Sequence, residues 1–168
     1  MALLEVLHFP DSRLHLKGVP VDVVDDKIKE IVRNMSETMY EYEGIGLAAI
    51  QVNIQKRIFI MDLSREDEPR NLLVFINPEI LEKDGEVVGS EGCLSVPGIY
   101  EEVIRAENIK LKYLDVDGIE QIISCNGLMS VCAQHEIDHL DGKVFVEYLS
   151  SLKQNYIKKK MKKIFKPV

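Results

Sequence analysis

The sequence predicts an α+β fold in which strands lie between helices. Three observations support this prediction. An apolar stripe with helical spacing comes early, several short runs rich in Ile, Val and Phe fill the middle, and helical spacing returns near the end. No repeat, linker or low-complexity segment separates these pieces, so we expect a single domain over residues 1–168.

The first helix is expected between Asp25 and Glu43. Its apolar residues recur every three or four positions, which places them on one face: Ile28, Ile31, Val32, Met35, Met39 and Tyr42. Asp25 and Asp26 suit the first turn, where the helix dipole favours acidic groups, and Gly44 suits the end.

The middle of the chain is expected to form strands. Two apolar runs bounded by charged residues and proline resemble buried strands, and four more runs follow them: residues 56–63, 71–80, 86–96, 101–106, 108–118 and 119–127. The sequence "DVDG" at residues 115–118 indicates a turn between the last two.

Two further helices are expected after the strands. From Leu128 the apolar period becomes helical again, and His135 and His139 fall on the same face as Val131 and Cys132. A last helix is expected over residues 152–165, with Pro167 after it.

Charge and composition limit the partners. The net charge of the 168 residues is −7, yet the segment from Ser151 onward holds seven lysines and no acid, which leaves 14 basic and 28 acidic side chains before it. No apolar run reaches the roughly 18 residues that a membrane span needs, and the first ten residues do not resemble a secretory signal. We therefore expect a cytoplasmic protein without a membrane or DNA partner, whose three cysteines are thiols or metal ligands.

A metal-binding pattern lies on the second helix. His135, Glu136 and His139 form H-E-x-x-H, and residues four apart on a helix direct both imidazoles toward one ion. Glu136 is rotated by about 100° from His135, beside the ion, where it can take a proton from a water molecule. The alternative interpretation is two buried histidines with a chance glutamate.

The third ligand is expected to be a thiolate, because no further histidine lies just downstream. Cys132 sits one turn before His135, where its short side chain stops short of an ion between the histidines. Cys93 comes from another segment, "SEGCLSVPG", whose glycines allow close backbone approach. We therefore choose Cys93 as the ligand and Cys132 as a small buried wall residue. A His₂Cys set suits Fe²⁺, Zn²⁺, Ni²⁺ or Co²⁺.

The segment "EGIGLAAIQ", residues 43–51, joins the first helix to the next strand. Its glycines and alanines permit close packing, and the amide of Gln51 can donate to a carbonyl oxygen. The simpler interpretation is a helix end followed by a tight loop.

Three motifs, "GIGLAAIQ", "EGCLS" and "QHEIDHL", closely resemble those of the bacterial peptide deformylases, and the resemblance covers nearly the whole chain. It implies small, mostly antiparallel sheets around a central helix that carries the two histidines. It also implies metal ligands Cys93, His135 and His139, usually around Fe²⁺ in the cell. Glu136 is then the general acid and base, and Gln51 and the backbone N–H of Leu94 stabilise the oxyanion.

The reaction that the resemblance implies is hydrolysis of the formyl group from N-formylmethionyl nascent peptides, with release of formate. The methionine side chain is expected in a pocket formed by Ile45, Leu128, Val131 and Cys132, and the peptide backbone is expected to pair near Gly46 and Gly92. Glu91 is a candidate for orienting neighbouring groups, with Arg105 as its basic partner.

The lysines near the C-terminus have two interpretations. The first is a solvated face of a docked helix, and the second is a contact with ribosomal RNA. The lysines concerned are Lys153, Lys158, Lys159, Lys160, Lys162, Lys163 and Lys166. Two alternatives to the deformylase also follow from H-E-x-x-H: a metallopeptidase, and a non-catalytic protein with a closed structural metal site.

Overall fold

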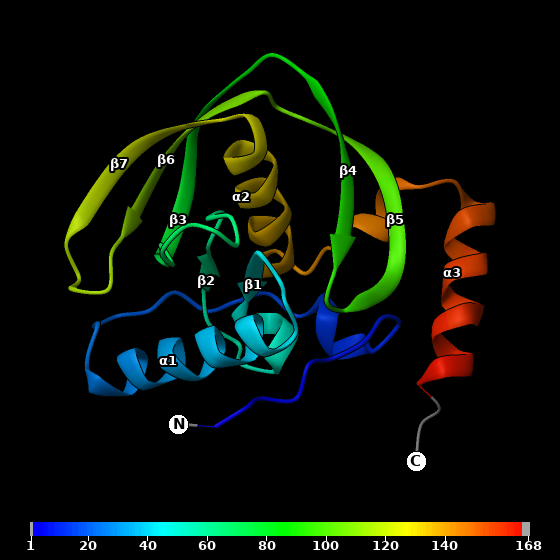
Figure 1. Ribbon diagram of the computed structural model, residues 1–168, viewed down its shortest axis with the longest axis horizontal. Coiled ribbons are helices and arrows are strands. Elements are labelled where there is room, and N and C mark those ends of the chain that lie inside the picture. The colour runs from blue at the N-terminus through cyan, green and yellow to red at the C-terminus, as the bar shows by residue number, and fades with distance from the viewer. Residues whose placement is uncertain (1, 166–168) are drawn as a thin grey trace.

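The fold is built around helix α2 (Gly127–Leu140), which lies between two antiparallel sheets (Figure 1). The structure is a computed structural model and describes residues 2–165. The larger sheet has the order β1-β2-β3-β6-β7: Gly46–Ala48, Ile58–Met61, Leu73–Asp84, Asn108–Leu114 and Glu120–Asn126. The smaller sheet pairs β4 (Val87–Cys93) with β5 (Val96–Arg105). The expected α+β fold with a central helix is confirmed.

Helix α2 is buried on almost every side. From Ser130 to Leu140 each residue except Asp138 is buried, because strands of both sheets contact the helix. Its apolar side packs on the larger sheet, where the rings of Phe59 and Phe75 stack with centroids 4.5 Å apart. A helix in this position is normally apolar all round, so its buried polar residues require specific partners.

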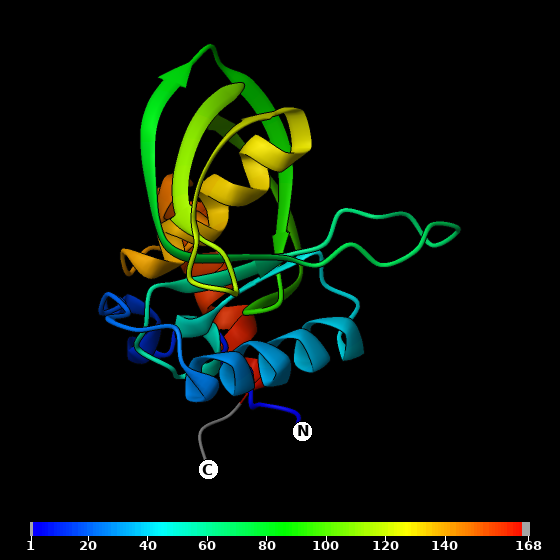
Figure 2. The same cartoon turned by 90° about the vertical axis from the view of Figure 1, so that its left-hand side faces the viewer.

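Helix α1 (Asp26–Glu41) covers the end of the larger sheet that contains β1 and β2 (Figure 2). The Asp25 side chain accepts a hydrogen bond from the backbone N–H of Ile28, which caps the helix as expected. At the other end, the N–H of Gly44 donates to the carbonyl of Met39 over 2.9 Å. The residues between Asp25 and Gly44 therefore form the helix that the apolar stripe predicted.

The C-terminal helix α3 (Ser151–Ile164) lies on the outside of the smaller sheet (Figure 1). Ile157 and Met161 are buried against a cluster that includes Val96, Ile99 and Val103 of β5. The short 3₁₀ helices η1 (Ser12–His15), η2 (Ala49–Val52) and η3 (Phe145–Tyr148) complete the described elements. Pro167, expected after the last helix, and Lys166, one of the clustered lysines, lie outside the described residues.

Two segments differ from the sequence prediction. Residues 43–51 were expected to form a loop but contain strand β1 and most of helix η2. The strand was missed because three residues without polar alternation give too short a signal. Strand β5 was expected from Glu101 but begins at Val96 and includes Pro97 and Gly98. An edge strand tolerates proline because its N–H is not needed for pairing on the open side.

Within residues 2–165, none of the helices combines the length and the apolar character that crossing a bilayer requires.

The anchoring of α2 can be tested with two leucines from its opposite ends. Leu140 is fully buried against the larger sheet, whereas Leu128 is 59 % exposed. We expect Leu140→Ala to lower the free energy of unfolding by about 3 kcal/mol, through lost burial and an unfilled cavity. Leu128→Ala should change it by less than about 0.5 kcal/mol. Urea unfolding of both variants measures the difference, and equal losses would contradict this packing.

Candidate metal centre

Three potential metal ligands from two elements converge at one point. Donor atoms of Cys93, His135 and His139 all lie within 4.8 Å of one another. The two histidine Nε2 atoms are 3.3 Å apart, and Cys93 Sγ is 3.4 Å from His139 Nε2. Metal–ligand bonds of about 2.0–2.3 Å in a tetrahedral arrangement place neighbouring donors about 3.3–3.6 Å apart. The donor set and its spacing therefore fit a divalent transition metal, and three protein donors leave a fourth position open.

The fold brings these donors together by placing the end of β4 beside α2. His135 and His139 are one turn apart on α2, so their imidazoles project to the same side. Cys93 is the last residue of β4, where the pairing with β5 shifts register between Glu91 and Cys93. A strand that ends beside the helix thus brings a thiol to the two imidazoles.

The His135 ring is oriented by a buried carboxylate. Nδ1 of His135 lies 2.8 Å from Glu91 Oε1, and a carboxylate acceptor there holds the proton on Nδ1 and leaves Nε2 free to bind a metal. Arg105 donates to both Glu91 oxygens over 2.7 and 2.8 Å, which confirms the expected pair. Burial acts to raise the pKa of Glu91, but the hydrogen bonds from Arg105 and His135 outweigh it and lower that pKa. Glu91 is therefore a stable anion.

His139 has fewer partners than His135. It is fully buried, and burial holds its pKa well below the usual value, which keeps the imidazole neutral, the form that ligates metals. Its Nδ1 has no hydrogen-bond partner among residues 2–165. Of the two imidazoles, only that of His135 is hydrogen-bonded to a carboxylate within this part of the chain.

Glu136 faces the same point without being one of the three donors. Its Oε1 lies 3.9 Å from His135 Nε2 and 4.0 Å from His139 Nε2. The side chain is buried, and burial raises the pKa of this carboxyl to about 7 although the nearby His135 opposes the effect. A carboxyl group with a pKa near neutrality can both accept and return a proton.

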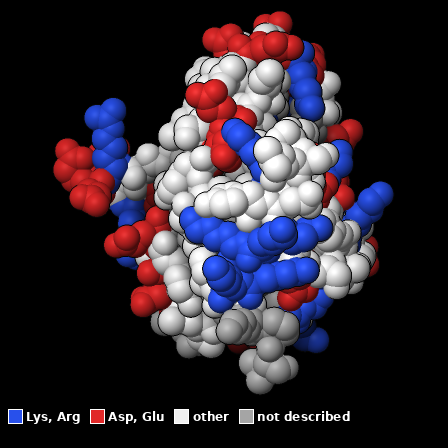
Figure 3. All heavy atoms as spheres, turned by 90° about the vertical axis from the view of Figure 1, so that its right-hand side faces the viewer, with Lys and Arg blue, Asp and Glu red and all other residues white. Residues whose placement is uncertain are grey.

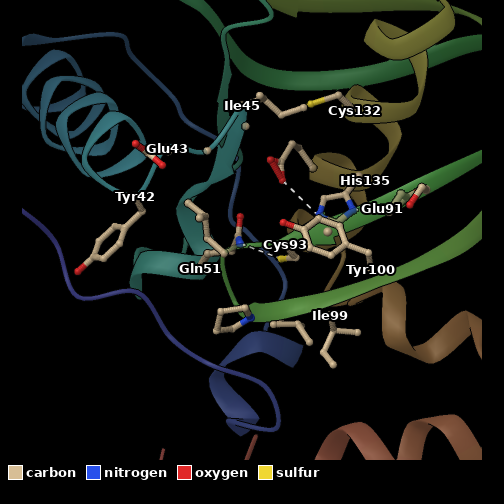
Figure 4. Close-up of a pocket in the computed structure, with 18 of the residues that line it drawn as sticks. Tyr42, Glu43, Ile45, Gln51, Glu91, Cys93, Ile99, Tyr100, Cys132 and His135 are labelled. Carbon is tan, nitrogen blue, oxygen red and sulfur yellow. Dashed lines mark hydrogen bonds and ion pairs between the residues drawn. The ribbon is translucent and has the colours of Figure 1, made fainter. Parts of the chain in front are cut away.

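The amide of Gln51 is fixed in one orientation. Its Oε1 accepts from the backbone N–H of Ala48 over 2.9 Å, so Nε2 must point the other way. There it donates to Cys93 Sγ over 3.3 Å (Figure 4). It also donates to Ser95 Oγ over 3.1 Å. The backbone of the 43–51 segment thus aims a hydrogen-bond donor at Cys93, one of the three candidate metal ligands.

The small residues of that segment are needed for close packing. A Cβ atom on Gly46 would lie 2.7 Å from Glu136 Oε2 and 3.0 Å from Cys132 Sγ. Any side chain at position 46 would displace the Glu136 carboxylate. The expectation that these glycines permit close approach is confirmed.

Gln51, Cys93, His135 and Glu136 line a pocket of about 470 Å³ between β1, β4, β5 and α2 (Figure 4). All six residues expected to bind substrate line it: Ile45, Gly46, Gly92, Leu128, Val131 and Cys132. Ile45 and Leu128 are exposed at its mouth, whereas Val131 and Cys132 are buried in its wall. Burial holds the pKa of Cys132 well above its usual value, so this thiol stays neutral, and it is not among the three converging donors.

Several lining residues were not anticipated from the sequence. They follow α1 or belong to the early part of β5: Tyr42, Glu43, Pro97, Gly98 and Ile99. Ser95, which accepts from Gln51, was also missed. Because β5 was expected to begin only at Glu101, no strand pattern placed Ile99 in the wall of the pocket.

Comparison with known proteins agrees with this geometry. The family model described as polypeptide deformylase matches residues 3–155. The peptide deformylase of Chromobacterium violaceum is 55% identical over 163 residues, covering 97% of this chain and 96% of that protein. The corresponding protein of Neisseria gonorrhoeae is 54% identical over 164 residues, with 97% and 96% covered.

Solved structures show the same relationship. The crystal structure of peptide deformylase from Ehrlichia chaffeensis in complex with actinonin has a TM-score of 0.94 at 41% identity, covering 99% of this chain and 100% of that chain. A peptide deformylase from Legionella pneumophila has a TM-score of 0.91 at 40% identity, with 97% and 95% covered. The chain therefore belongs to the polypeptide deformylase family, the metal-dependent enzymes that remove the N-formyl group from newly made proteins.

Proposed function

We propose that this deformylase holds one divalent metal ion on Cys93, His135 and His139, and that the ion is Fe²⁺ in the cell, with Zn²⁺, Ni²⁺ or Co²⁺ as substitutes. The observation that carries the proposal is the convergence of one thiol and two imidazole nitrogens within 4.8 Å at the base of a pocket. Such an ion lowers the pKa of a water molecule and polarises a carbonyl oxygen.

Glu136 is the general base and acid in this proposal. Its carboxylate lies within 4.0 Å of both imidazole nitrogens, beside the position that an attacking water occupies. It accepts the proton of that water as the formyl carbon is attacked, and it returns the proton to the departing amine nitrogen. The products are formate and a peptide with a free N-terminal methionine.

Two hydrogen-bond donors stabilise the negative charge that develops on the formyl oxygen. One is the Nε2–H of Gln51, which in this structure points at Cys93 Sγ and can be taken by a substrate oxygen. The other is the backbone N–H of Leu94, the residue after Cys93 in the wall of the pocket. Donors fixed by the fold before substrate arrives need no reorganisation during the reaction.

The substrate backbone has two strand edges available. Among residues 2–165, β1 pairs only with β2 and β4 pairs only with β5, and both strands contribute residues to the pocket. A peptide in extended conformation between these edges would form strand-like hydrogen bonds near Gly46 and Gly92. The methionine side chain then enters the apolar part of the pocket, against Ile45, Leu128, Val131 and Cys132.

The basic helix α3 provides a ribosome contact in this proposal. Its lysines gather on the outer face of the molecule (Figure 3), and five of them are exposed: Lys153, Lys158, Lys159, Lys162 and Lys163. Ile157 and Met161 hold the opposite side of the helix on the body. Clustered lysines on an otherwise acidic protein favour RNA phosphates, and substrates emerging from ribosomes require the enzyme in the cytoplasm.

The ligand assignment is tested by exchanging two thiols. Cys93→Ser should lower metal content strongly, because it removes one of three donors, whereas Cys132→Ser should keep one ion per chain. Metal analysis of both purified proteins decides the matter. Loss of the ion from the Cys132 variant with retention in the Cys93 variant would reverse the assignment.

The role of Glu136 is tested by Glu136→Gln, which keeps the shape of the side chain but cannot accept the proton. We expect full metal content and a fall in kcat of about 10³-fold for formate release from a formylated peptide. Near-normal turnover by the metal-loaded variant would remove Glu136 from the mechanism.

The ribosome contact is tested by charge reversal on α3. The combined change Lys158→Glu, Lys159→Glu and Lys162→Glu should weaken ribosome binding more than about tenfold and flatten its salt dependence. Activity on a short formyl peptide should persist, because Ile157 and Met161 still anchor the helix. The control carries three reversals at exposed lysines elsewhere, Lys17, Lys27 and Lys83. Equal weakening in the control, or salt-insensitive binding, would count against a specific contact.

A further inference from the structure

A continuous run of charged side chains leads from His135 to the surface behind α2. Beyond Glu91, Arg105 donates through Nη1 to Asp138 Oδ2 over 2.5 Å. The same Asp138 oxygen accepts from the hydroxyl of Tyr148 over 2.8 Å. The run therefore joins β4, β5, α2 and η3, and its outer end lines a second surface hollow on the side of α2 away from the metal centre.

The run is buried where it approaches the metal centre and open at its far end. The side chains of Glu91 and Arg105 are 4 % and 5 % exposed, that of Asp138 is 17 % exposed, and Tyr148 is 51 % exposed as a residue. Water can replace the Tyr148 hydroxyl at such an exposed position. It cannot readily replace Asp138, which faces a buried guanidinium.

Asp138 changes how strongly Arg105 acts on Glu91. Glu91 Oε1 has two donors, His135 Nδ1 and Arg105 Nη2, and they compete for the same oxygen. With Asp138 present, the charge of Arg105 is shared between two carboxylates. Without it, the whole charge would polarise Glu91 toward the arginine and weaken the hydrogen bond to His135.

The basicity of His135 depends on that hydrogen bond. A carboxylate that accepts from Nδ1 of a ligating histidine makes Nε2 a better donor to a metal and fixes the ring. Nδ1 of His139 has no partner within the described part of the chain, so the second imidazole offers no comparable support. The affinity of the site is therefore most sensitive to the groups behind His135.

We propose that Asp138 is a positioning residue of the metal centre: it tunes metal affinity through Arg105 and Glu91 without touching the ion or the substrate. This inference rests on the proposed role of His135 as a ligand. Asp138 is one of the two positions inside H-E-x-x-H without an assigned role. Its side chain points away from the pocket, toward Arg105.

The test is metal affinity of the full chain, measured by competition of the zinc-loaded protein with a chelator. Asp138→Asn keeps the size of the side chain and removes its charge, and it should weaken zinc binding about three- to tenfold. Tyr148→Phe is the matched control, because it removes the other contact to the same oxygen. It should change the affinity less than twofold.

A double-mutant cycle separates tuning from a merely structural role. In a Glu91→Gln background the path to His135 is already broken, so Asp138→Asn should cause no further loss of affinity. An unchanged affinity in the single variant, or the same loss in both backgrounds, would overturn the proposal. If the asparagine variant does not fold, Asp138→Ser, which leaves room for water at Arg105 Nη1, takes its place with the same expectations.

Failure of this inference differs from failure of the proposed function. Zinc retained at full affinity by Cys93→Ser would disprove the ligand set itself. Zinc lost from Cys93→Ser but unaffected by Asp138→Asn would disprove only the tuning.

Discussion

The structure depends on the burial of a polar helix face inside an otherwise apolar core. Ser130, Gln134, His135, Glu136 and His139 all lie on α2 with little or no solvent contact. Burying such groups costs several kcal/mol unless each finds a partner. Gln134 is satisfied by Ala106 and Ser130, and His135 by Glu91. The placement of β4 and β5 beside the helix follows from this requirement, because these strands bring Glu91 and Arg105 to it.

The same arrangement leaves the reactive side of α2 open to a peptide. The two sheets meet the helix from different directions, and in the described part of the chain neither β1 nor β4 has a strand partner on the side that faces the pocket. A site with buried donors at its base and free strand edges at its walls can hold an extended chain by its backbone. In the proposed function, specificity for the first residue rests on the apolar wall, and the chemistry rests on Glu136, Gln51 and the three proposed metal ligands.

Much of this account could be predicted from the sequence, and the remainder could not for physical reasons. Helical spacing predicted α1, α2 and α3, and the spacing of H-E-x-x-H predicted two converging imidazoles, because both are local properties. The position of Cys132 one turn before His135, and the glycines around Cys93, favoured Cys93 as the third donor, and the structure brings its thiol to the two imidazoles. The full path from Glu91 through Arg105 to Asp138 and Tyr148 depends on strand register and on how η3 returns to α2, and no local pattern encodes that. Strand β1 was missed because three residues carry almost no periodic signal.

Formate release from a formyl-Met-Ala-Ser peptide is the decisive assay, made with protein purified without oxygen and with bound metal quantified in the same sample. We expect many turnovers per bound ion, with activity that disappears when the ion is removed and returns when it is restored. Metal-loaded protein that releases no formate but cleaves internal peptide bonds would contradict this expectation in favour of a metallopeptidase. Loaded protein that does neither, and unfolds when the ion is removed, would contradict it in favour of a structural site.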